Sequence, residues 1–380
     1  MRCYFDHNAS TPPSPEALDA FVQAASHAIG NPTSIHADGQ AARRIVEQAR
    51  HDVAQLLGCQ PKEIVFTSGG TESDNLALFG LESRHVIISA IEHPAVLESA
   101  AELERRGAKV TRVAVNSQGV VELESLGRVR ASETGLVSIM HSNNETGAVQ
   151  PIAEIAGIAH QSGAVMHSDG VQAAGKLPLD MAALGIDLYS ITGHKFGALK
   201  GAGALFVREG VKLRRTQFGG RHERERRPGT ENVAGIAALG AAARWLCEHG
   251  EDERQRLASL RDRLEQSVLA RISGAMVNSA DVPRTPNTSN IAFDGLDGEA
   301  LVIALDLAGF SVATGAACSS GAVNPSHVLT AMGLSRDQAK SCLRFSMGRG
   351  NTAGQVDSLV DALAAVVARL RSIAPSHAQS

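Results

Sequence analysis

The chain has 380 residues, of which 43% are hydrophobic and 20% are charged, and its formal net charge is -4. This balance predicts a globular protein with ample material for a core, and the length favours two domains. The small, mixed charge argues against nucleic acid or an anionic membrane as the main ligand.

The N-terminus and the cysteines both indicate a reducing compartment. The first ten residues, MRCYFDHNAS, contain no apolar stretch of signal-peptide length, and nowhere do 18 apolar residues follow one another. The five cysteines, at positions 3, 59, 247, 318 and 342, form no CxxC pair and no zinc-type spacing with histidine. We therefore expect reduced thiols, no metal site and a cytoplasmic location.

Short apolar runs alternate with helix-length segments between about residues 60 and 207. We predict strands at EIVFTS (63–68), HVIISAIE (85–92), KVTRVAV (109–115), GLVSIMHSN (135–143), AVMHSDG (164–170), DLYSITGH (187–194) and GALFV (203–207). Segments such as TESDNLALFGLES (71–83) and PIAEIAGIAHQSG (151–163) lie between them and are predicted to be helices. The alternation predicts an α/β fold with a mostly parallel, seven-stranded sheet that is covered by helices on both faces. Such sheets bind ligands at the carboxyl ends of their strands.

A second unit is predicted after a long helix that runs from about Glu231 to Ala270. It contains the strands NTSNIAF (287–293) and SCLRFSMG (341–348), the helix GEALVIALDLAG (298–309), the segment PSHVLTAMG (325–333) and a terminal helix from about Thr352 to Ile373. Short strands mixed with helices in this way predict a smaller α+β domain.

The clearest candidates for chemistry are a lysine and a carboxylate at two predicted strand ends. Lys195 follows Ser190, Thr192 and His194, where it could form a Schiff base with its pKa lowered by neighbouring positive charge. In isolation, a surface location is the simpler interpretation of a His-Lys pair. Asp169 ends an apolar strand, and a buried carboxylate there requires a cation or a hydrogen-bond donor.

Two glycine-containing stretches raise the question of phosphate binding. GVQAAGK, from Gly170 to Lys176, matches the glycine and lysine spacing of a nucleotide-binding P-loop, but Leu177 stands where that loop needs Ser or Thr for magnesium. Gly70 and Thr71 follow a predicted strand and open a helix, where free backbone N–H groups form an anion site. Helix capping by Thr71 is compatible with phosphate binding there.

Four further polar features allow a structural and a functional interpretation. His93 lies at a strand end before a helix that begins with proline, either as a structural histidine or as an active-site group. Asn143 and Asn144 lie at another strand end. Arg344 lies within an apolar strand, where it would form an internal salt bridge or bind a substrate carboxylate. The stretch RHERERR (221–227) predicts a solvated or subunit-facing loop rather than a nucleic-acid site.

One cysteine lies in an unusual setting. The stretch TGAACSSG, from Thr314 to Gly321, surrounds Cys318 with small residues and with the permissive backbone of two glycines. A cysteine stored in a core would have branched apolar neighbours instead. We therefore predict that Cys318 lies on an accessible, mobile loop.

The order and wording of these motifs resemble the cysteine desulfurases, which are pyridoxal-phosphate enzymes of fold type I in the class V aminotransferase superfamily. The resemblance rests on FTSGGTESDN, IEHPAV, HSNNETG, HSDGVQAAGK, SITGHK, GGRHERERRPGTENVAG, TGAACSSG and LRFSMGR. The extended segment CSSGAVNPSHVL is similar to the group with a long cysteine loop, group I. The resemblance implies a large cofactor-binding domain at residues 12–255 and a small domain, formed by residues 1–11 and 256–380, that carries the cysteine loop.

The resemblance implies a cofactor site built from these motifs. Lys195 would carry pyridoxal 5'-phosphate, Asp169 would face the pyridinium nitrogen, and His93 would stack on the ring and move protons. Gln172 would donate a hydrogen bond to the phenolic oxygen of the ring. The phosphate would be held by Gly70, Thr71, Thr192 and His194, and by Thr230 of the neighbouring subunit, which implies a homodimer.

The resemblance also implies the reaction. Asn144 and Arg344 would hold the carboxylate of L-cysteine, and Lys195 would take the α-proton. The thiolate of Cys318 would then take the sulfur as a persulfide while L-alanine leaves. Because an ordinary thiol is mostly protonated at neutral pH, this attack needs help from a group such as His93 or the cofactor. A loop of small residues suits a cysteine that must reach first the cofactor and then an acceptor.

The sequence departs from the family pattern at a few positions. HKFGALKG has Phe196–Leu199 where the family often shows an aromatic residue or histidine followed by Gly-Pro, which affects the rigidity of that loop. Thr192 stands where Ser is common and Ser10 where Thr is usual, so both positions keep a hydroxyl. Every proposed catalytic group is present.

Alternative functions stay open on the sequence alone. A class V transaminase or carbon-sulfur lyase would need Lys195 and Asp169 but not Cys318, a selenocysteine lyase would prefer selenocysteine, and a sulfur-carrier scaffold would need no cofactor. The acceptor protein is open between iron-sulfur cluster assembly, transfer-RNA thiolation and DNA phosphorothioation. We expect neither a membrane nor direct nucleic-acid contact.

Overall fold

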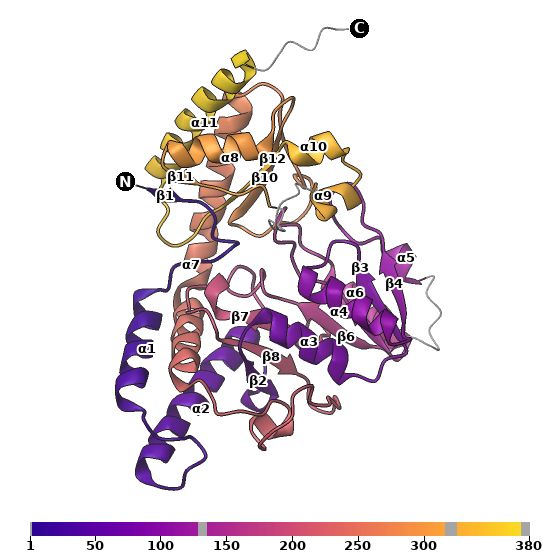
Figure 1. Cartoon of the computed structure of the whole chain (residues 1–380), viewed down its shortest axis with the longest axis vertical. Helices are drawn as coiled ribbons and strands as arrows, with labels where there is room; N and C mark the ends of the chain where they lie inside the picture. Colours follow the sequence, from indigo (N-terminus) through magenta and orange to yellow (C-terminus); the bar gives the residue numbers. More distant parts are fainter. Residues whose placement is uncertain (1, 128–134, 316–324, 374–380) are drawn as a thin grey trace.

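A seven-stranded sheet forms the centre of the larger part of the molecule (Figure 1). In this computed structural model, the described residues are 2–127, 135–315 and 325–373. The strands follow the order β2 (Ile64–Thr67), β8 (Gly203–Val207), β7 (Leu188–Thr192), β6 (Val165–Asp169), β5 (Leu136–Ser138), β3 (His85–Ser89) and β4 (Lys109–Val113). Strand β8 runs antiparallel to β2 and β7, and the other adjacent pairs are parallel. The predicted α/β fold with a mostly parallel sheet of seven strands is confirmed.

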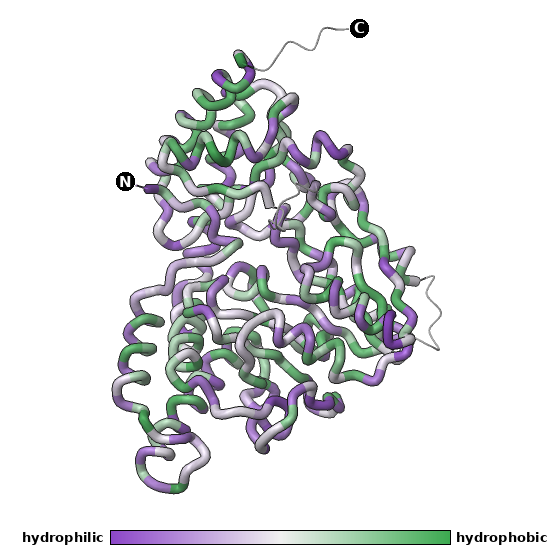
Figure 2. Tube along the Cα trace, in the orientation of Figure 1, coloured by the Kyte–Doolittle hydropathy of each residue, from purple (hydrophilic) through white to green (hydrophobic). Residues whose placement is uncertain are grey.

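Both faces of this sheet are buried, which explains why its strands are nearly continuous apolar runs. Successive strand residues point to opposite faces, so Val65 and Phe66 enter different hydrophobic clusters, as do Leu188 and Tyr189. One cluster includes residues of α3 (Gly70–Gly80) and α4 (Pro94–Arg105), and the other includes residues of α1 (Pro15–His27), α2 (Ala37–Leu57), α5 (Leu123–Gly127) and α6 (Ile152–Gln161). Figure 2 shows hydrophobic residues along these strands and hydrophilic ones in the loop around the short helix η3 (Glu223–Glu225).

The part of the molecule drawn at the top of Figure 1 has a hydrophobic cluster of its own, apart from the two on the faces of the large sheet, and we call it the second cluster. Its sheet consists of β12 (Cys342–Ser346), β10 (Thr288–Phe293) and β9 (Ala275–Val277), all antiparallel, and β1 (Cys3–Tyr4) pairs with β11 (Phe310–Ser311) beside it. The helices of this part are α8 (Gly298–Leu307), α9 (His327–Ala331), α10 (Arg336–Lys340) and α11 (Ala353–Ile373). The strands and helices predicted for the second unit are therefore present.

The 39-residue helix α7 (Val233–Arg271) connects the two parts. Its first half buries Ile236 and Leu239 in the sheet cluster that also contains α1 and α2. Its second half buries Leu257 and Leu264 in the second cluster. The long helix predicted from about Glu231 to Ala270 is confirmed. Neither α7 nor any other helix in the described ranges has a stretch apolar enough to cross a membrane.

The N-terminal segment also crosses between the two parts (Figure 1). Phe5 is fully buried in the second cluster, whereas Ala17 is fully buried in the cluster against the large sheet. Asn8 lies between them and is 2% exposed. The segment therefore carries polar backbone groups through the interior, where each needs a partner. The division into domains at residues 11/12 and 255/256 stays a prediction.

A buried ion pair anchors the arginine-rich loop. Nη1 and Nη2 of Arg50 each donate to the carboxylate of Glu223 at 2.8 Å, and the backbone N–H of Phe66 donates to it at 3.0 Å. Glu223, Arg224 and Glu225 have φ angles of 43°, 55° and 67°. This left-handed backbone costs non-glycine residues roughly 1–2 kcal/mol each, so the ion pair offsets strain in the turn.

The packing of Gly170 against Tyr189 makes a prediction about stability. A Cβ at position 170 would lie 2.0 Å from Cζ of Tyr189. This ring is fully buried, and its hydroxyl is hydrogen-bonded to Nδ1 of His141 at 2.8 Å. Because the ring cannot move without breaking that bond, Gly170→Ala is expected to lower the free energy of unfolding by roughly 2–3 kcal/mol in urea denaturation.

Gly157 in α6 is the matched control. It is exposed, and a Cβ there would meet nothing within 4 Å. Gly157→Ala should leave stability unchanged or raise it by roughly 0.5–1 kcal/mol. Equal urea midpoints for the two variants would contradict the tight packing at Gly170.

Candidate active site

Lys195 lies in the single turn that follows β7, at the carboxyl end of the sheet. Its Nζ donates hydrogen bonds to the carbonyl oxygens of Asn8 at 2.5 Å and Ala9 at 2.9 Å. Burial lowers the pKa of Lys195 to about 8, and the Arg344 charge acts in the same direction, whereas the Asp169 carboxylate opposes the shift. Near this pH a large fraction of the amine is neutral and nucleophilic.

Asp169 and His93 approach each other at the ends of neighbouring elements. Asp169 ends β6 and accepts a hydrogen bond from the backbone N–H of Val171 at 2.9 Å. His93 caps α4, and its Nδ1 accepts from the N–H of Ala95 at 3.1 Å, which leaves the proton of the neutral ring on Nε2. One ring nitrogen of His93 lies within 4.8 Å of a carboxylate oxygen of Asp169. Burial lowers the pKa of His93 and raises that of Asp169, while each group's charge opposes the shift of the other.

Two further buried carboxyl groups lie behind Asp169, and the sequence analysis missed both. A carboxylate oxygen of Asp74 lies within 4.8 Å of one of Asp169, and burial raises the pKa of Asp74 well above its usual value, with Asp169 adding to the shift. Oε1 of Glu92 accepts from Oγ of Ser89 at 2.5 Å and from the N–H of Met140 at 2.9 Å. Burial raises the pKa of Glu92 to about 8. At neutral pH Glu92 is therefore mostly protonated, and burial favours the protonated form of Asp74 in the same way.

The turn between β2 and α3 has the free N–H groups that an anion site requires. The first N–H groups of α3, which begins at Gly70, have no helical acceptor and lie at the positive end of the helix dipole. A Cβ on Gly69 would lie 3.3 Å from Oγ1 of Thr192, and one on Gly70 would lie 2.6 Å from Cγ2 of Val171. The glycines therefore allow the helix to approach the strand ends closely. Burial lowers the pKa of the adjacent His194 to about 4, so its ring is neutral.

Asn8 links the lysine to the rest of the site, although the sequence analysis gave it no role. Its carbonyl oxygen accepts from Lys195 and also from Nε2 of Gln172 at 3.0 Å. Its Oδ1 accepts from Nζ of Lys176 at 2.9 Å and from Nδ2 of Asn287 at 3.1 Å. The segment that was compared with a P-loop therefore supplies two donors to this network. Gln172 and Lys195 thus donate to the same carbonyl oxygen, and the predicted contact of Gln172 with the cofactor ring stays a prediction.

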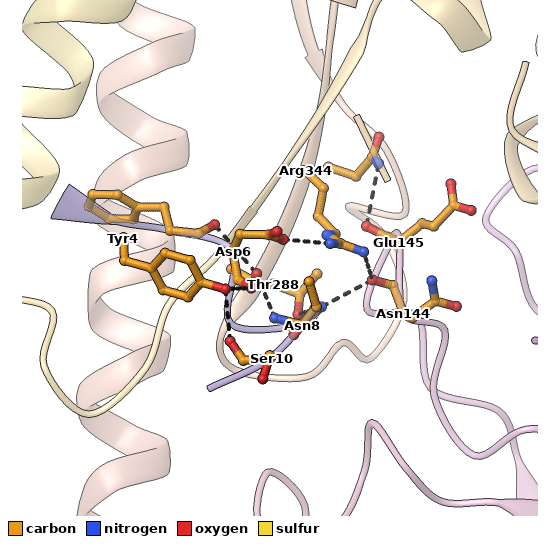
Figure 3. A network of polar contacts seen from close by, with 12 residues as sticks. Tyr4, Asp6, Asn8, Ser10, Asn144, Glu145, Thr288 and Arg344 are labelled. Atoms are coloured by element: carbon orange, nitrogen blue, oxygen red, sulfur yellow. Dashed lines mark hydrogen bonds and ion pairs between the residues drawn. The ribbon is translucent and has the colours of Figure 1, made fainter. Parts of the chain in front are cut away.

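Arg344 lies on β12, and Figure 3 shows its guanidinium between Asp6 and Asn144. Its Nη2 donates to Oδ1 of Asp6 at 2.6 Å and its Nη1 to the carbonyl oxygen of Asn144 at 3.1 Å. The side chain is buried, and its Nε has no partner among the described residues. A guanidinium in this state retains a donor for an oxygen ligand. Asn143 has a structural role, because its Oδ1 accepts from the backbone N–H of Glu145 at 2.8 Å.

Thr230 is not joined to this group, and Cys318 lies outside the described residues. Thr230 is exposed and, in the part of the chain that the structure describes, forms no hydrogen bond with another candidate residue. Cys318 and its predicted loop lie in the range 316–324, outside the described residues. The other candidates gather at the carboxyl end of the sheet, with the helix N-terminus at Gly70 and Thr71 beside Thr192 and His194.

The chemistry of this arrangement is that of a carbonyl-reactive site. A lysine amine with a lowered pKa attacks aldehydes, a buried carboxylate pairs with a cationic N–H, and a helix N-terminus binds phosphate. These three groups together suit an aromatic aldehyde with a ring nitrogen and a phosphate, which describes pyridoxal phosphate. The buried guanidinium adds a place for a carboxylate.

Comparisons with known proteins agree with this chemistry. The chain matches the family model described as Aminotransferase class-V over residues 3–359. A cysteine desulfurase of Nostoc sp. is 44% identical over 377 residues, which cover 98% of this chain and 94% of the relative.

Solved structures share the fold over most of its length. A NifS-like protein has a TM-score of 0.91 and 35% identity, and the match covers 97% of this chain and 100% of that chain. A structure described as SspA in complex with cysteine has a TM-score of 0.81 and 32% identity, covering 91% of this chain and 99% of that chain.

Glu92 makes a prediction about the pH dependence of stability. Burial raises its pKa from 4.5 to about 8, so the folded chain holds a proton that the unfolded chain releases. This contribution to stability is present at low pH and is lost as the pH rises through that window. Glu92→Gln imitates the protonated group and keeps Oε1 as an acceptor. Between about pH 5 and pH 8, the free energy of unfolding of the variant should therefore fall less steeply with pH than that of the wild-type chain. The two slopes should differ by about 1.4 kcal/mol per pH unit.

The measurement is urea denaturation of both proteins at several pH values, with Glu154→Gln as the control. Glu154 is an exposed glutamate in the first turn of α6. Its substitution should leave the pH slope of the wild-type chain unchanged. If Glu92→Gln also has the wild-type slope, Glu92 does not hold a proton in the folded state.

Proposed function

This chain belongs to the class-V aminotransferase family and, within it, to the cysteine desulfurases, and we propose that it removes sulfur from L-cysteine with pyridoxal 5'-phosphate bound through Lys195. The observation that carries the proposal is a buried lysine amine with a lowered pKa, close to the buried carboxylate of Asp169 at the carboxyl end of the sheet. The structure of SspA in complex with cysteine, which has the same fold, supports L-cysteine as the substrate.

The side chains present fit pyridoxal phosphate. Lys195 supplies the nucleophilic amine that an aldehyde requires for covalent attachment. Asp169 would hold the protonated ring nitrogen, and a cationic N–H there would lower the raised pKa of this carboxyl group again. The phosphate would be held by Gly70, Thr71, Thr192 and His194. When bound, the cofactor supplies an electron sink for the negative charge that develops on the substrate carbon.

Lys195 would also move the α-proton of the substrate. When the amine is free, the carbonyl oxygens of Asn8 and Ala9 give it a defined position. A base whose pKa lies near the working pH is efficient in proton transfer, and burial brings Lys195 into that range. His93, with its proton on Nε2, would deliver a proton to the reacting centre.

Arg344 and Asn144 would bind the carboxylate of L-cysteine. The Arg344 guanidinium is buried and has an unpaired Nε donor, while Asp6 holds it in place through Nη2. Binding a carboxylate would satisfy that donor and add a second negative partner to a buried cation. Asn144 lies next to this guanidinium, because its backbone carbonyl oxygen accepts from Nη1.

Cys318 would accept the sulfur. Its thiolate attacks the substrate sulfur, the carbon-sulfur bond breaks, a sulfur-sulfur bond forms, and the substrate carbon takes up a proton. The products are L-alanine and a persulfide on Cys318, so this step needs no external oxidant or reductant. Its support is the resemblance of the segment TGAACSSG and the relatives named above.

We further propose a cytoplasmic homodimer of the group with a long cysteine loop. Thr230, exposed after the turn that Glu223 anchors, would reach the phosphate of the partner subunit. Ile35 and Phe218 are 94% and 84% exposed and offer apolar area for such an interface. The acceptor of the persulfide sulfur would be a protein, such as an iron-sulfur scaffold or a thiolation enzyme.

Cys318→Ala tests the persulfide step directly. Incubated with L-cysteine and a reductant, the wild-type chain should form sulfide and alanine in equal amounts. The variant should lose both products by roughly a hundredfold or more, because its nucleophile is missing. Cys247→Ala, which changes an exposed cysteine of α7, should retain wild-type rates.

The spectrum of the bound cofactor, recorded beforehand, separates loss of the nucleophile from loss of the cofactor. Alanine formation that persists in Cys318→Ala would refute the persulfide and favour a carbon-sulfur lyase. A selenocysteine lyase that bypasses Cys318 would keep its turnover of selenocysteine in Cys318→Ala while it lost that of cysteine. An equal ratio of the two turnover rates in the wild-type chain and in Cys318→Ala would rule it out.

Arg344→Lys tests the binding of the substrate carboxylate. Lysine keeps the positive charge but cannot form two parallel hydrogen bonds with a carboxylate. The KM for L-cysteine should rise roughly tenfold to a hundredfold, as expected for the loss of a charge-assisted hydrogen bond. The cofactor spectrum should stay as in the wild type. An unchanged KM would place the carboxylate elsewhere.

A further inference from the structure

Lys176 is a buried lysine to which the proposed reaction gives no task. It is 6% exposed and follows β6 in the same turn as Gln172. Its Nζ donates to Oε1 of Gln172 at 2.6 Å and to Oδ1 of Asn8 at 2.9 Å. A buried amine is costly unless it is hydrogen-bonded, so a lysine in this position needs both acceptors. Oδ1 of Asn8 has a second donor in Asn287, whereas Lys176 is the donor that the structure gives Oε1 of Gln172.

These bonds determine which end of the Gln172 amide faces the lysine of the active site. A primary amide has an oxygen that only accepts and a nitrogen that only donates. Because Oε1 accepts from Lys176, Nε2 is the end that turns toward the N-terminal segment, where it donates to the carbonyl oxygen of Asn8 at 3.0 Å. The same carbonyl oxygen accepts from Nζ of Lys195 at 2.5 Å.

We propose that Lys176 is a positioning residue that fixes the Gln172 amide with its N–H end on the Asn8 carbonyl oxygen, which also accepts from the amine of Lys195. The proposal deepens the proposed function and rests on Lys195 as the reactive amine. A donor in this place cannot accept a hydrogen bond from the Lys195 ammonium, so it does not stabilise the charged form. A flipped amide would present Oε1 to the ammonium and would raise the pKa of Lys195.

The effect of Lys176 on Lys195 passes mainly through this amide rather than through charge. Burial lowers the pKa of Lys176 well below its usual value, and the charges of Lys195 and Arg344 lower it further, which favours the neutral amine. A neutral amine still donates both of its hydrogen bonds. The charged groups that act on Lys195 come from three other elements: Arg344 on β12, Asp169 on β6 and Asp6 in the N-terminal segment.

The cavity beside Lys176 has room for a longer side chain. Lys176 lines a cavity of about 510 Å³ that also borders Lys195, Trp245 and Leu246. Lys176→Arg can extend into that space and keep a donor for Gln172. Lys176→Met keeps the length of the side chain and removes the donor.

The experiment measures how fast the Lys195 amine is acylated by a small anhydride as a function of pH. It uses the full-length chain after the cofactor has been removed with hydroxylamine, and mass spectrometry follows the Lys195 peptide. We expect Lys176→Met to slow labelling at about pH 7 by roughly threefold to tenfold, which corresponds to a pKa rise of half a unit to one unit. Lys176→Arg should label at the wild-type rate.

Gln172→Leu provides the background that separates the two explanations. Without an amide to orient, adding Lys176→Met to Gln172→Leu should change the labelling rate by less than about twofold. If Lys176→Met slows labelling equally with and without Gln172, Lys176 acts by its charge. If Lys176→Met has no effect in the chain that keeps Gln172, Lys176 does not act on Lys195. Either result would overturn the proposal.

A second variant keeps the test decisive if Lys176→Met does not fold. Gln172→Glu preserves the shape and the contact with Lys176 but places an oxygen where Nε2 lies, so it should also slow labelling. A wild-type rate in this variant would overturn the proposal. Since labelling requires no turnover, these results are independent of whether the chain desulfurates cysteine.

Discussion

The amine of Lys195 donates hydrogen bonds to the carbonyl oxygens of Asn8 and Ala9. The rest of the site depends on the N-terminal segment that supplies these two oxygens. This segment runs through the interior between two hydrophobic clusters, so its polar groups must be paired inside the protein. Asn8 takes its partners from both parts of the molecule, including Oγ1 of Thr288 at 2.9 Å and Oγ of Ser346 at 2.9 Å. The position of the reactive amine is therefore tied to how the two parts meet.

Burial shifts the ionisable groups of the site toward their neutral forms. The pKa values of Lys195 and His93 are lowered, and those of Asp169 and Glu92 are raised. A site without compensating charges favours neutral groups because isolated ions are costly to desolvate. Pyridoxal phosphate and a substrate carboxylate would supply the missing partners: a cationic ring nitrogen for Asp169 and an anion for Arg344. Binding of these ligands would thus restore the charges that the reaction needs.

The sequence predicted the sheet well because its strands are buried on both faces and therefore stand out as apolar runs, as at HVIIS in β3. It also placed Asp169 at the end of β6, Lys195 just after β7 and Arg344 within β12. The strand predicted before His93 was too long, since β3 ends at Ser89, but the helix that begins at Pro94 was predicted correctly. It missed the roles of Asn8 and Lys176 because their hydrogen bonds join residues 168 positions apart, which no local pattern reports. The two-residue strands β1 and β11 were not predicted for the same reason, since each is defined by its pairing with a strand far away in the sequence.

The central claim is that Lys195, held by the N-terminal segment, is the amine that carries the cofactor. The most direct measurement is reduction of the purified, cofactor-loaded chain with borohydride, followed by peptide mass spectrometry. The account predicts one pyridoxyl group per chain, on the peptide that contains Lys195. A pyridoxyl group on Lys176, on another lysine, or on none would contradict it.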